Sequence, residues 1–294
     1  MDIRAIFMGL SFGILWSSAF TSTRVIVLDA PPLTALVMRF LLSAVLGVLL
    51  ARAMGQSWRL TRAEWRTVII FGLCQNALYL GLNWVAMQRV EASAASIIAS
   101  MLPLLVAAAG ALFYGEKLRP MAVTGLLAGF AGVALIMGSR LTDGLDGPGV
   151  VMCLIAVVAL TAATLVLRGT GGSKNVLMLV ALQMAVGAIA LLPFSLMFEN
   201  AGDVVWSWTL VWAFLYTVLG PGLLATFIWF QLVSRIGATR AATFHFLTPF
   251  LGVSIAAAFL GERFGPTDLL GALIVAGGIL MVQLSKVQTR GPAA

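Results

Sequence analysis

The sequence predicts an all-α integral membrane protein with ten transmembrane helices in two inverted five-helix repeats. Of its 294 residues, 61% are hydrophobic and 10% are charged, against roughly 25% charged residues in a soluble domain. Charged residues separate apolar stretches of about 20 residues, the length that spans a bilayer. The second half also repeats markers of the first half. This composition excludes a disordered chain, a nucleic-acid-binding domain and a typical cytosolic enzyme, despite the net charge of +7.

Ten spans follow from the positions of the charged residues. Eight of them are stretches free of charge, one contains only Arg39, and one is unusually long and carries Gly220-Pro221-Gly222 near its middle. Glycine and proline there predict a broken or kinked helix. The expected spans are Ala5–Thr23, Pro31–Ala51, Thr67–Gln88, Ala92–Gly115, Pro120–Ser139, Gly147–Leu167, Asn175–Phe198, Val204–Ser234, Ala241–Gly261 and Leu269–Ser285.

Basic residues predict the orientation. Thirteen Lys and Arg residues fall on the side of the N-terminus and four on the opposite side. Because cytoplasmic loops carry the excess of positive charge, both termini are expected in the cytoplasm.

Two halves of the chain match at a shift of 146 residues. Pro103 aligns with Pro249, and Phe113-Tyr114-Gly115-Glu116-Lys117 aligns with Phe259-Leu260-Gly261-Glu262-Arg263. The expected repeats are residues 1–143 and 144–294, with five helices each. An odd number of helices inverts the second repeat in the membrane, an arrangement common in secondary transporters.

These features resemble the drug/metabolite transporter superfamily, and within it the EamA-type ten-helix exporters. The resemblance rests on Trp16-Ser17-Ser18-Ala19-Phe20, on Arg39-Phe40 and on the twin Gly-Glu-Lys/Arg junctions before Pro120 and Pro266. The whole chain is most similar to the bacterial aromatic amino-acid exporters of that family.

The resemblance implies a transporter in a bacterial inner membrane that exports amino acids, aromatic ones first, by alternating access through a central cavity. It implies a small-molecule substrate, no cofactor, no metal and no enzymatic activity, and we expect a monomer. Export of drugs or other amphiphilic metabolites is the alternative. A membrane-embedded hydrolase that uses Ser11 and His245 is a much less favoured alternative. Its G-x-S-x-G pattern, Gly9–Gly13, marks a nucleophilic serine only at a strand-to-helix turn, and here it falls inside a helix.

Charged residues are almost absent from the interior of the spans. Arg39 is the only one there, and no Asp, Glu or Lys lies near the middle of a span. The cavity should therefore suit an apolar, zwitterionic or neutral solute. We favour a structural role for Arg39, in bonding helix carbonyls or snorkelling, over a role as the partner of a carboxylate.

Polar residues within the spans define the candidate site. Asn76, Tyr79 and Asn83 share one helix face and either bind the solute or hold helices together. Ser100 lies beside the helix-breaking Pro103, and His245 beside Pro249. Aromatic and apolar side chains should pack on the ring of the solute. The predicted substrate-binding residues are Trp16, Asn76, Tyr79, Asn83, Ser100, Met101, His245 and Phe246.

Overall fold

The computed structural model describes residues 3–142, 144–166, 175–263 and 265–287. Ten helices in this part of the chain are long and apolar enough to cross a membrane, which confirms the predicted fold class. In chain order the elements are α1 (Ile3–Asp29), α2 (Pro32–Ala53), α3 (Arg62–Phe71), η1 (Gly72–Leu80), α4 (Gly81–Ala86), α5 (Ala92–Ala99), α6 (Leu102–Tyr114), α7 (Pro120–Thr142), α8 (Gly147–Val166), α9 (Val176–Phe198), η2 (Ala201–Asp203), α10 (Trp208–Thr217), η3 (Val218–Ala225), α11 (Thr226–Ile236), α12 (Ala238–Ala241), η4 (Ala242–Leu247), α13 (Thr248–Leu260) and α14 (Pro266–Val287).

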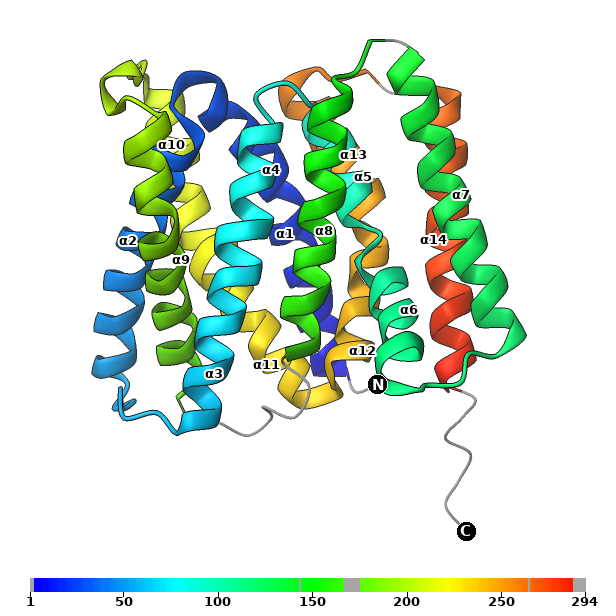
Figure 1. The fold of residues 1–294 in the computed structure, drawn as a ribbon, viewed down its shortest axis with the longest axis horizontal. Helices are drawn as coiled ribbons and strands as arrows, with labels where there is room; N and C mark the ends of the chain where they lie inside the picture. The colour runs from blue at the N-terminus through cyan, green and yellow to red at the C-terminus, as the bar shows by residue number, and fades with distance from the viewer. Residues whose placement is uncertain (1–2, 143, 167–174, 264, 288–294) are drawn as a thin grey trace.

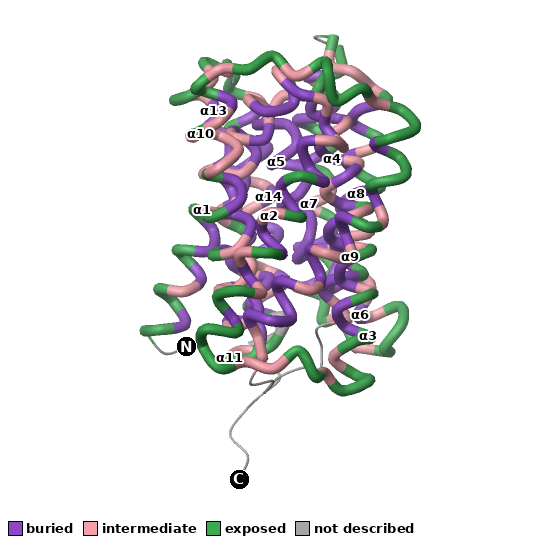
Figure 2. The backbone as a smooth tube through the Cα atoms, turned by 90° about the vertical axis from the view of Figure 1, so that its left-hand side faces the viewer, coloured by how far each residue is buried: buried purple, intermediate pink, exposed green. Residues whose placement is uncertain are grey.

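The helices form a bundle that is wider than it is deep. Helices α2 and α9 pack together at one end and α7 and α14 at the other, with the remaining spans between them (Figure 1). Each of these two pairs joins helices that correspond under the 146-residue shift. Buried residues concentrate in the interior of the bundle, whereas exposed residues gather on its outer surface and at its two ends (Figure 2).

Glycines allow α7 and α14 to approach closely. A Cβ atom built on Gly125 would lie 2.7 Å from the carbonyl oxygen of Gly278, and one on Gly132 would lie 2.9 Å from that of Gly271. These two contacts are equivalent in the two repeats. The shift of 146 residues relates Gly125 to Gly271 and Gly132 to Gly278, so it converts one contact into the other. Close helix approach is therefore the role of these glycines.

The local backbone also follows the shift of 146 residues. The π-helical segments η1 and η3 begin at Gly72 and Val218, which correspond to each other. Helices α6 and α13 end in left-handed glycines with nearly equal angles, φ 65° at Gly115 and φ 66° at Gly261. The boundary between repeats at residues 143 and 144 remains a prediction.

The chain stays helical through Gly220-Pro221-Gly222, so the predicted alternative of a broken helix is wrong, and a kink there stays a prediction. The chain continues from α10 through the π-helical η3 into α11 as one span, Trp208–Ile236, so the span also begins later than Val204. A π-helix accommodates Pro221 by widening one turn instead of ending the helix. Near the other two prolines the α-helix is interrupted. Two residues, Ser100 and Met101, separate α5 from α6 before Pro103, and the 3₁₀-helix η4 precedes α13 and Pro249.

Side chains at the ends of some helices cap the start of a neighbouring one. Glu199, after α9, accepts the backbone N–H groups of Leu33 and Thr34 at 2.9 and 2.6 Å, at the start of α2. Glu262 accepts those of Ala92 and Ser93 at 2.8 and 2.9 Å. The end of α13 packs beside the start of α5, so the Glu262 carboxylate meets the N-terminus of α5 rather than that of α14, the next helix in the chain.

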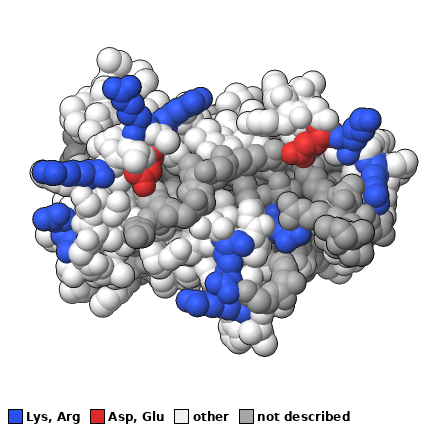
Figure 3. Space-filling model, turned by 90° about the horizontal axis from the view of Figure 1, so that it is seen from below, with Lys and Arg blue, Asp and Glu red and all other residues white. Residues whose placement is uncertain are grey.

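Charge is distributed unevenly between the two ends of the bundle. The N-terminus lies at the lower end in Figure 1. Seen from below, this end carries several Lys and Arg side chains and few acidic ones (Figure 3). The opposite end carries most of the acidic residues, among them Glu91, Glu199, Glu262 and Asp268. This asymmetry agrees with the excess of positive charge counted from the sequence.

Candidate functional site

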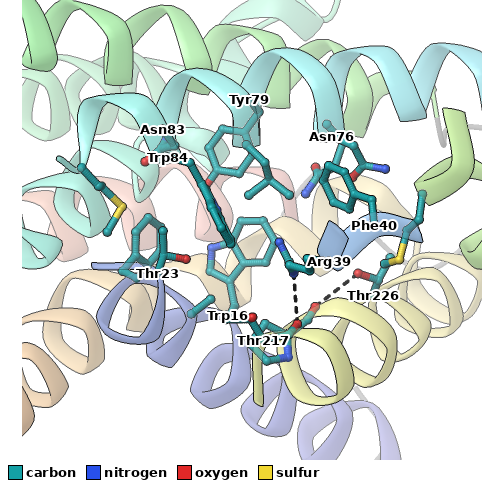
Figure 4. A pocket seen from close by; sticks show the side chains of 17 residues that line it. Trp16, Thr23, Arg39, Phe40, Asn76, Tyr79, Asn83, Trp84, Thr217 and Thr226 are labelled. Atoms are coloured by element: carbon teal, nitrogen blue, oxygen red, sulfur yellow. Dashed lines mark hydrogen bonds between the residues drawn. The ribbon is translucent and has the colours of Figure 1, made fainter. Parts of the chain in front are cut away.

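A small central cavity of about 40 Å³ lies between α1, α2, η1, α4, η3 and the start of α11 (Figure 4). Among the described residues, its wall contains aromatic, amide and hydroxyl side chains, one cation and no acidic residue. The lining residues are Trp16, Ala19, Phe20, Thr23, Arg39, Phe40, Gln75, Asn76, Tyr79, Leu80, Asn83, Trp84, Met87, Met184, Thr217, Pro221 and Thr226.

Arg39 brings the only charge to this wall. Its Nε donates to the carbonyl oxygen of Thr217 at 3.1 Å. Pro221 stands four residues after Thr217 and has no N–H, so this carbonyl has no α-helical donor, and Arg39 bonds it at the start of the π-helical η3. The expected carbonyl-bonding role of Arg39 is thus present.

Arg39 nevertheless retains capacity for a ligand. A guanidinium has five N–H donors, and only Nε forms a hydrogen bond within the described residues. The guanidinium carbon lies 5.5 Å from the centroid of the Phe40 ring and 5.6 Å from that of Trp84. Aromatic faces stabilise a buried cation without neutralising it, so a solute anion would still meet a positive charge.

Flat aromatic surfaces line the cavity beside Arg39. The rings of Trp16 and Tyr79 lie parallel, with centroids 5.9 Å apart and an interplanar angle of 7°. Trp84 is almost completely buried and projects into the same space (Figure 4). These rings provide stacking surfaces for a planar solute.

Two predicted asparagines lie on the cavity wall with different partners. Asn76 donates through Nδ2 to the carbonyl oxygen of Gln183 at 2.8 Å and also to its side-chain oxygen, so it joins η1 to α9. Within the described residues, the side chain of Asn83 has one hydrogen bond, which its Oδ1 accepts from Sγ of Cys153 at 4.0 Å. Asn76 therefore serves as an interhelical link, whereas Asn83 keeps most of its hydrogen-bonding capacity.

The structure does not bring all predicted residues to the cavities. Ser100 is fully buried and donates to the carbonyl oxygen of Ile97 at 2.5 Å, as expected for a serine that bonds to its own helix. Met101 and Phe246 line neither the central cavity nor the smaller one that contains His245. Both were predicted to pack on the ring of the solute, and their side chains lie outside these two spaces.

Several lining residues were missing from the prediction. Arg39 was considered and set aside, although it was the one charge inside a span. Thr217 and Thr226 flank Gly220-Pro221-Gly222, which could have indicated them. Phe40 and Trp84 carry no such sign, because many aromatic residues in this chain face the lipid.

The hydrolase alternative lacks its nucleophile–base pair. Ser11 lies on the exposed surface of α1, whereas His245 is buried between helices. No hydrogen bond joins them in the described part of the chain. An activated serine needs a base within hydrogen-bonding reach.

A separate ionic cluster lies at the acidic end of the bundle. Arg140 donates to Glu91 at 2.6 Å, to Asp268 at 2.9 Å and to Ser93 at 2.9 Å, and so connects α5, α7 and α14. Burial raises the pKa of the Glu91 carboxyl, while Arg140 acts in the opposite direction. The internal shift places Gly237 and Ala122 at the positions of Glu91 and Asp268, so the other repeat has no equivalent carboxylates.

Comparison with known proteins agrees with this architecture. The profile of the EamA-like transporter family matches residues 3–138 and 147–284. The chain belongs to the EamA-like transporter family. It is a multi-pass membrane transporter of small metabolites, and the predicted superfamily is confirmed.

Relatives of this EamA transporter are named as transporters. The uncharacterized transporter YvbV of Bacillus subtilis is 26% identical over 94% of this chain and 90% of its own length. The probable amino-acid metabolite efflux pump of Salmonella typhimurium is 24% identical over 93% and 92% of the two chains. The aromatic amino acid exporter YddG of Ancylobacter novellus is 28% identical, over 46% of this chain and 47% of its own. One crystal structure, 20% identical in sequence, has a TM-score of 0.72 over 99% of this chain and 100% of that one, and so shares the fold.

Proposed function

We propose that this EamA transporter exports amino acids, aromatic ones first, by alternating access through the central cavity. One observation carries the proposal: a buried Arg39 with unused donors stands in a cavity that has aromatic walls and no acidic residue. The carboxylate of an amino acid would neutralise Arg39, and its ring would stack against Trp16, Tyr79 or Trp84. The amide oxygen of Asn83 accepts a weak S–H hydrogen bond from Cys153, and its second lone pair suits the α-ammonium group.

The energetics favour a carboxylate at Arg39. Hydrogen bonds between ionised partners contribute about 1.5–3 kcal/mol each, more than bonds between neutral groups. Aromatic stacking adds about 0.5–1.5 kcal/mol. A cationic amphiphile would gain the stacking but would place its charge near Arg39, so the cavity supports amino acids better than cationic drugs.

Binding of a ligand series to the purified protein tests this assignment. Tryptophan should bind, and tryptamine, which lacks the carboxylate, should bind at least about tenfold more weakly. Arg39→Met should reduce tryptophan binding to the level of tryptamine. Arg89→Met is the matched control, because the Arg89 side chain is 75% exposed at the surface. Equal affinity for tryptophan and tryptamine would contradict the proposal and favour the export of drugs or other metabolites.

The orientation is part of the same proposal. We place both termini in the cytoplasm and the protein in a bacterial inner membrane, on the support of the uneven basic charge. A reporter fused after Ala294 that works only in the cytoplasm should be active. Activity of a periplasmic reporter at that position would refute the orientation.

A further inference from the structure

An open pocket lies at the end of the bundle opposite the N-terminus, where α1 and α9 end and α2 begins (Figure 1). It holds about 570 Å³ and is lined by residues 27–33, 85, 88, 198–200, 203 and 205. We call it the mouth pocket. Binding sites for small molecules typically measure about 300–1,000 Å³. The mouth pocket therefore has room for an amino acid, whereas the central cavity, at about 40 Å³, must widen to take one.

The mouth pocket and the central cavity are stacked along the same three helices. On α1, Thr23 lines the central cavity and Val27 lines the mouth pocket. Residues four apart share one face of a helix, and these two lie about 6 Å apart along its axis. The corresponding pairs elsewhere are Arg39 and Leu33 on α2, and Met87 and Gln88 just after α4. Only a thin layer of side chains therefore separates the two spaces.

Arg24 stands at the level between the two spaces. It follows Thr23 on α1, and its Nη1 donates a hydrogen bond to the carbonyl oxygen of Met87, the residue that caps the C-terminus of α4. Carbonyl oxygens at the end of a helix carry a partial negative charge, and a hydrogen bond from a cation is stronger than one between neutral groups. Arg24 thus ties α1 to the end of α4 across the passage from one space to the other.

The opposite side of the central cavity is closed by packed rings. A Cβ atom built on Gly9 of α1 would clash with the Phe244 ring of η4, so these two segments are in direct contact. The ring of His245 meets those of Phe12 and Trp16 edge to face, each at a centroid distance of 5.2 Å. Widening toward this side would pull these rings apart, whereas widening toward the mouth pocket releases the hydrogen bond of Arg24. The central cavity therefore opens more readily toward the mouth pocket.

We propose that Arg24 is the latch between the central cavity and the mouth pocket, and that the solute leaves the central cavity through this pocket. When Arg24 releases the carbonyl of Met87, α1 and the end of α4 separate and the passage widens. The mouth pocket then releases an amino acid, because within the described residues no Lys or Arg lines it to hold the carboxylate. The inference rests on the proposed transport of amino acids.

Blocking the mouth pocket tests the route with Arg24 left intact. Gln88 and Arg89 are exposed neighbours, and only Gln88 lines the pocket. Each would be replaced by cysteine in a Cys74→Ala background, where Cys153 is fully buried. The protein would be modified in detergent with a bulky methanethiosulfonate reagent and then reconstituted in liposomes. Modified Gln88→Cys should lose tryptophan flux, and modified Arg89→Cys should keep it.

Reduction separates blockage from damage to the fold, because it removes the adduct and leaves the substituted residue. Flux through Gln88→Cys should therefore return after reduction. Flux that persists in modified Gln88→Cys overturns the route through the mouth pocket alone. No tryptophan flux by the unsubstituted protein overturns the proposed function as well.

Access of a thiol reagent to the central cavity tests the latch itself. Thr23 is buried and lines that cavity, so labelling of Thr23→Cys in the same background reports on opening. Labelling should be at least about tenfold faster with Arg24→Met, which loses a charged hydrogen bond. It should stay near the original rate with Arg24→Lys, which can still donate to Met87, and with the control Arg89→Met. Equal rates with Arg24 and Arg24→Met, or a rate with Arg24→Lys as fast as with Arg24→Met, would overturn the latch.

Discussion

Two adjacent glycines in α14 should respond in opposite ways to the same substitution. Gly278 faces α7, and a Cβ atom there would lie 2.5 Å from the carbonyl oxygen of Gly125 and 2.7 Å from the backbone nitrogen of Gly129. Gly277 faces outward, and a Cβ atom there would meet nothing within 4 Å. Gly278→Ala therefore requires the two backbones to separate, whereas Gly277→Ala does not.

The expected size of the effect follows from these contacts. Overpacking costs about 1–3 kcal/mol, and replacing glycine by alanine inside a helix returns about 0.5–1 kcal/mol. The net cost is then about 0–2.5 kcal/mol, and with about 2 °C per kcal/mol for a chain of this size Gly278→Ala should lower the midpoint of thermal unfolding by up to about 5 °C. Gly277→Ala should leave the midpoint unchanged or raise it by about 1–2 °C.

A thiol-reactive fluorogenic dye can measure unfolding in detergent, because Cys153 is fully buried and becomes reactive only when the fold opens. Within the described residues, neither the central cavity nor the mouth pocket is lined by α7 or α14. The folded fraction of both variants should therefore bind solute like the unsubstituted protein. A midpoint for Gly278→Ala at or above that of Gly277→Ala would refute the close crossing of these helices.

Two further predictions concern protons. No acidic residue lines the central cavity or the smaller cavity that contains His245 in the described structure, so solute flux in liposomes should follow the solute gradient and depend weakly on pH near neutrality. Uphill accumulation of the solute driven by a pH gradient alone would contradict this prediction. In that case His245→Ala would be the variant to measure. Burial raises the pKa of Glu91 in the folded protein, so its contribution to stability is greatest at low pH and declines as pH rises through that pKa. The midpoint of thermal unfolding should therefore fall less between about pH 4 and pH 7 in Glu91→Gln than in the unsubstituted protein. An identical dependence of the midpoint on pH in the two proteins would show that the pKa of Glu91 is not raised.

The sequence by itself determined the membrane class, the number of spans, the repeat and the family. Each of these depends on properties that can be read along the chain. The length of the apolar stretches relative to the thickness of a bilayer and the spacing of charged residues indicate the spans. Residues such as Gly115 and Gly261, which recur after 146 residues, indicate the repeat. The shared face of Asn76, Tyr79 and Asn83 could be predicted for the same reason, because it depends only on local helical geometry.

Only the tertiary structure decided which side chains share a cavity. Arg39 meets the carbonyl of Thr217, 178 residues away, because α2 packs beside η3. Asn76 is occupied by Gln183 for a similar reason. Two predicted residues near helix breaks, Ser100 and Phe246, lie off the walls, because the direction of a side chain depends on the rotation of its helix. That rotation is set by packing against neighbouring helices, and in an apolar chain the sequence pattern distinguishes lipid-facing from cavity-facing positions only weakly.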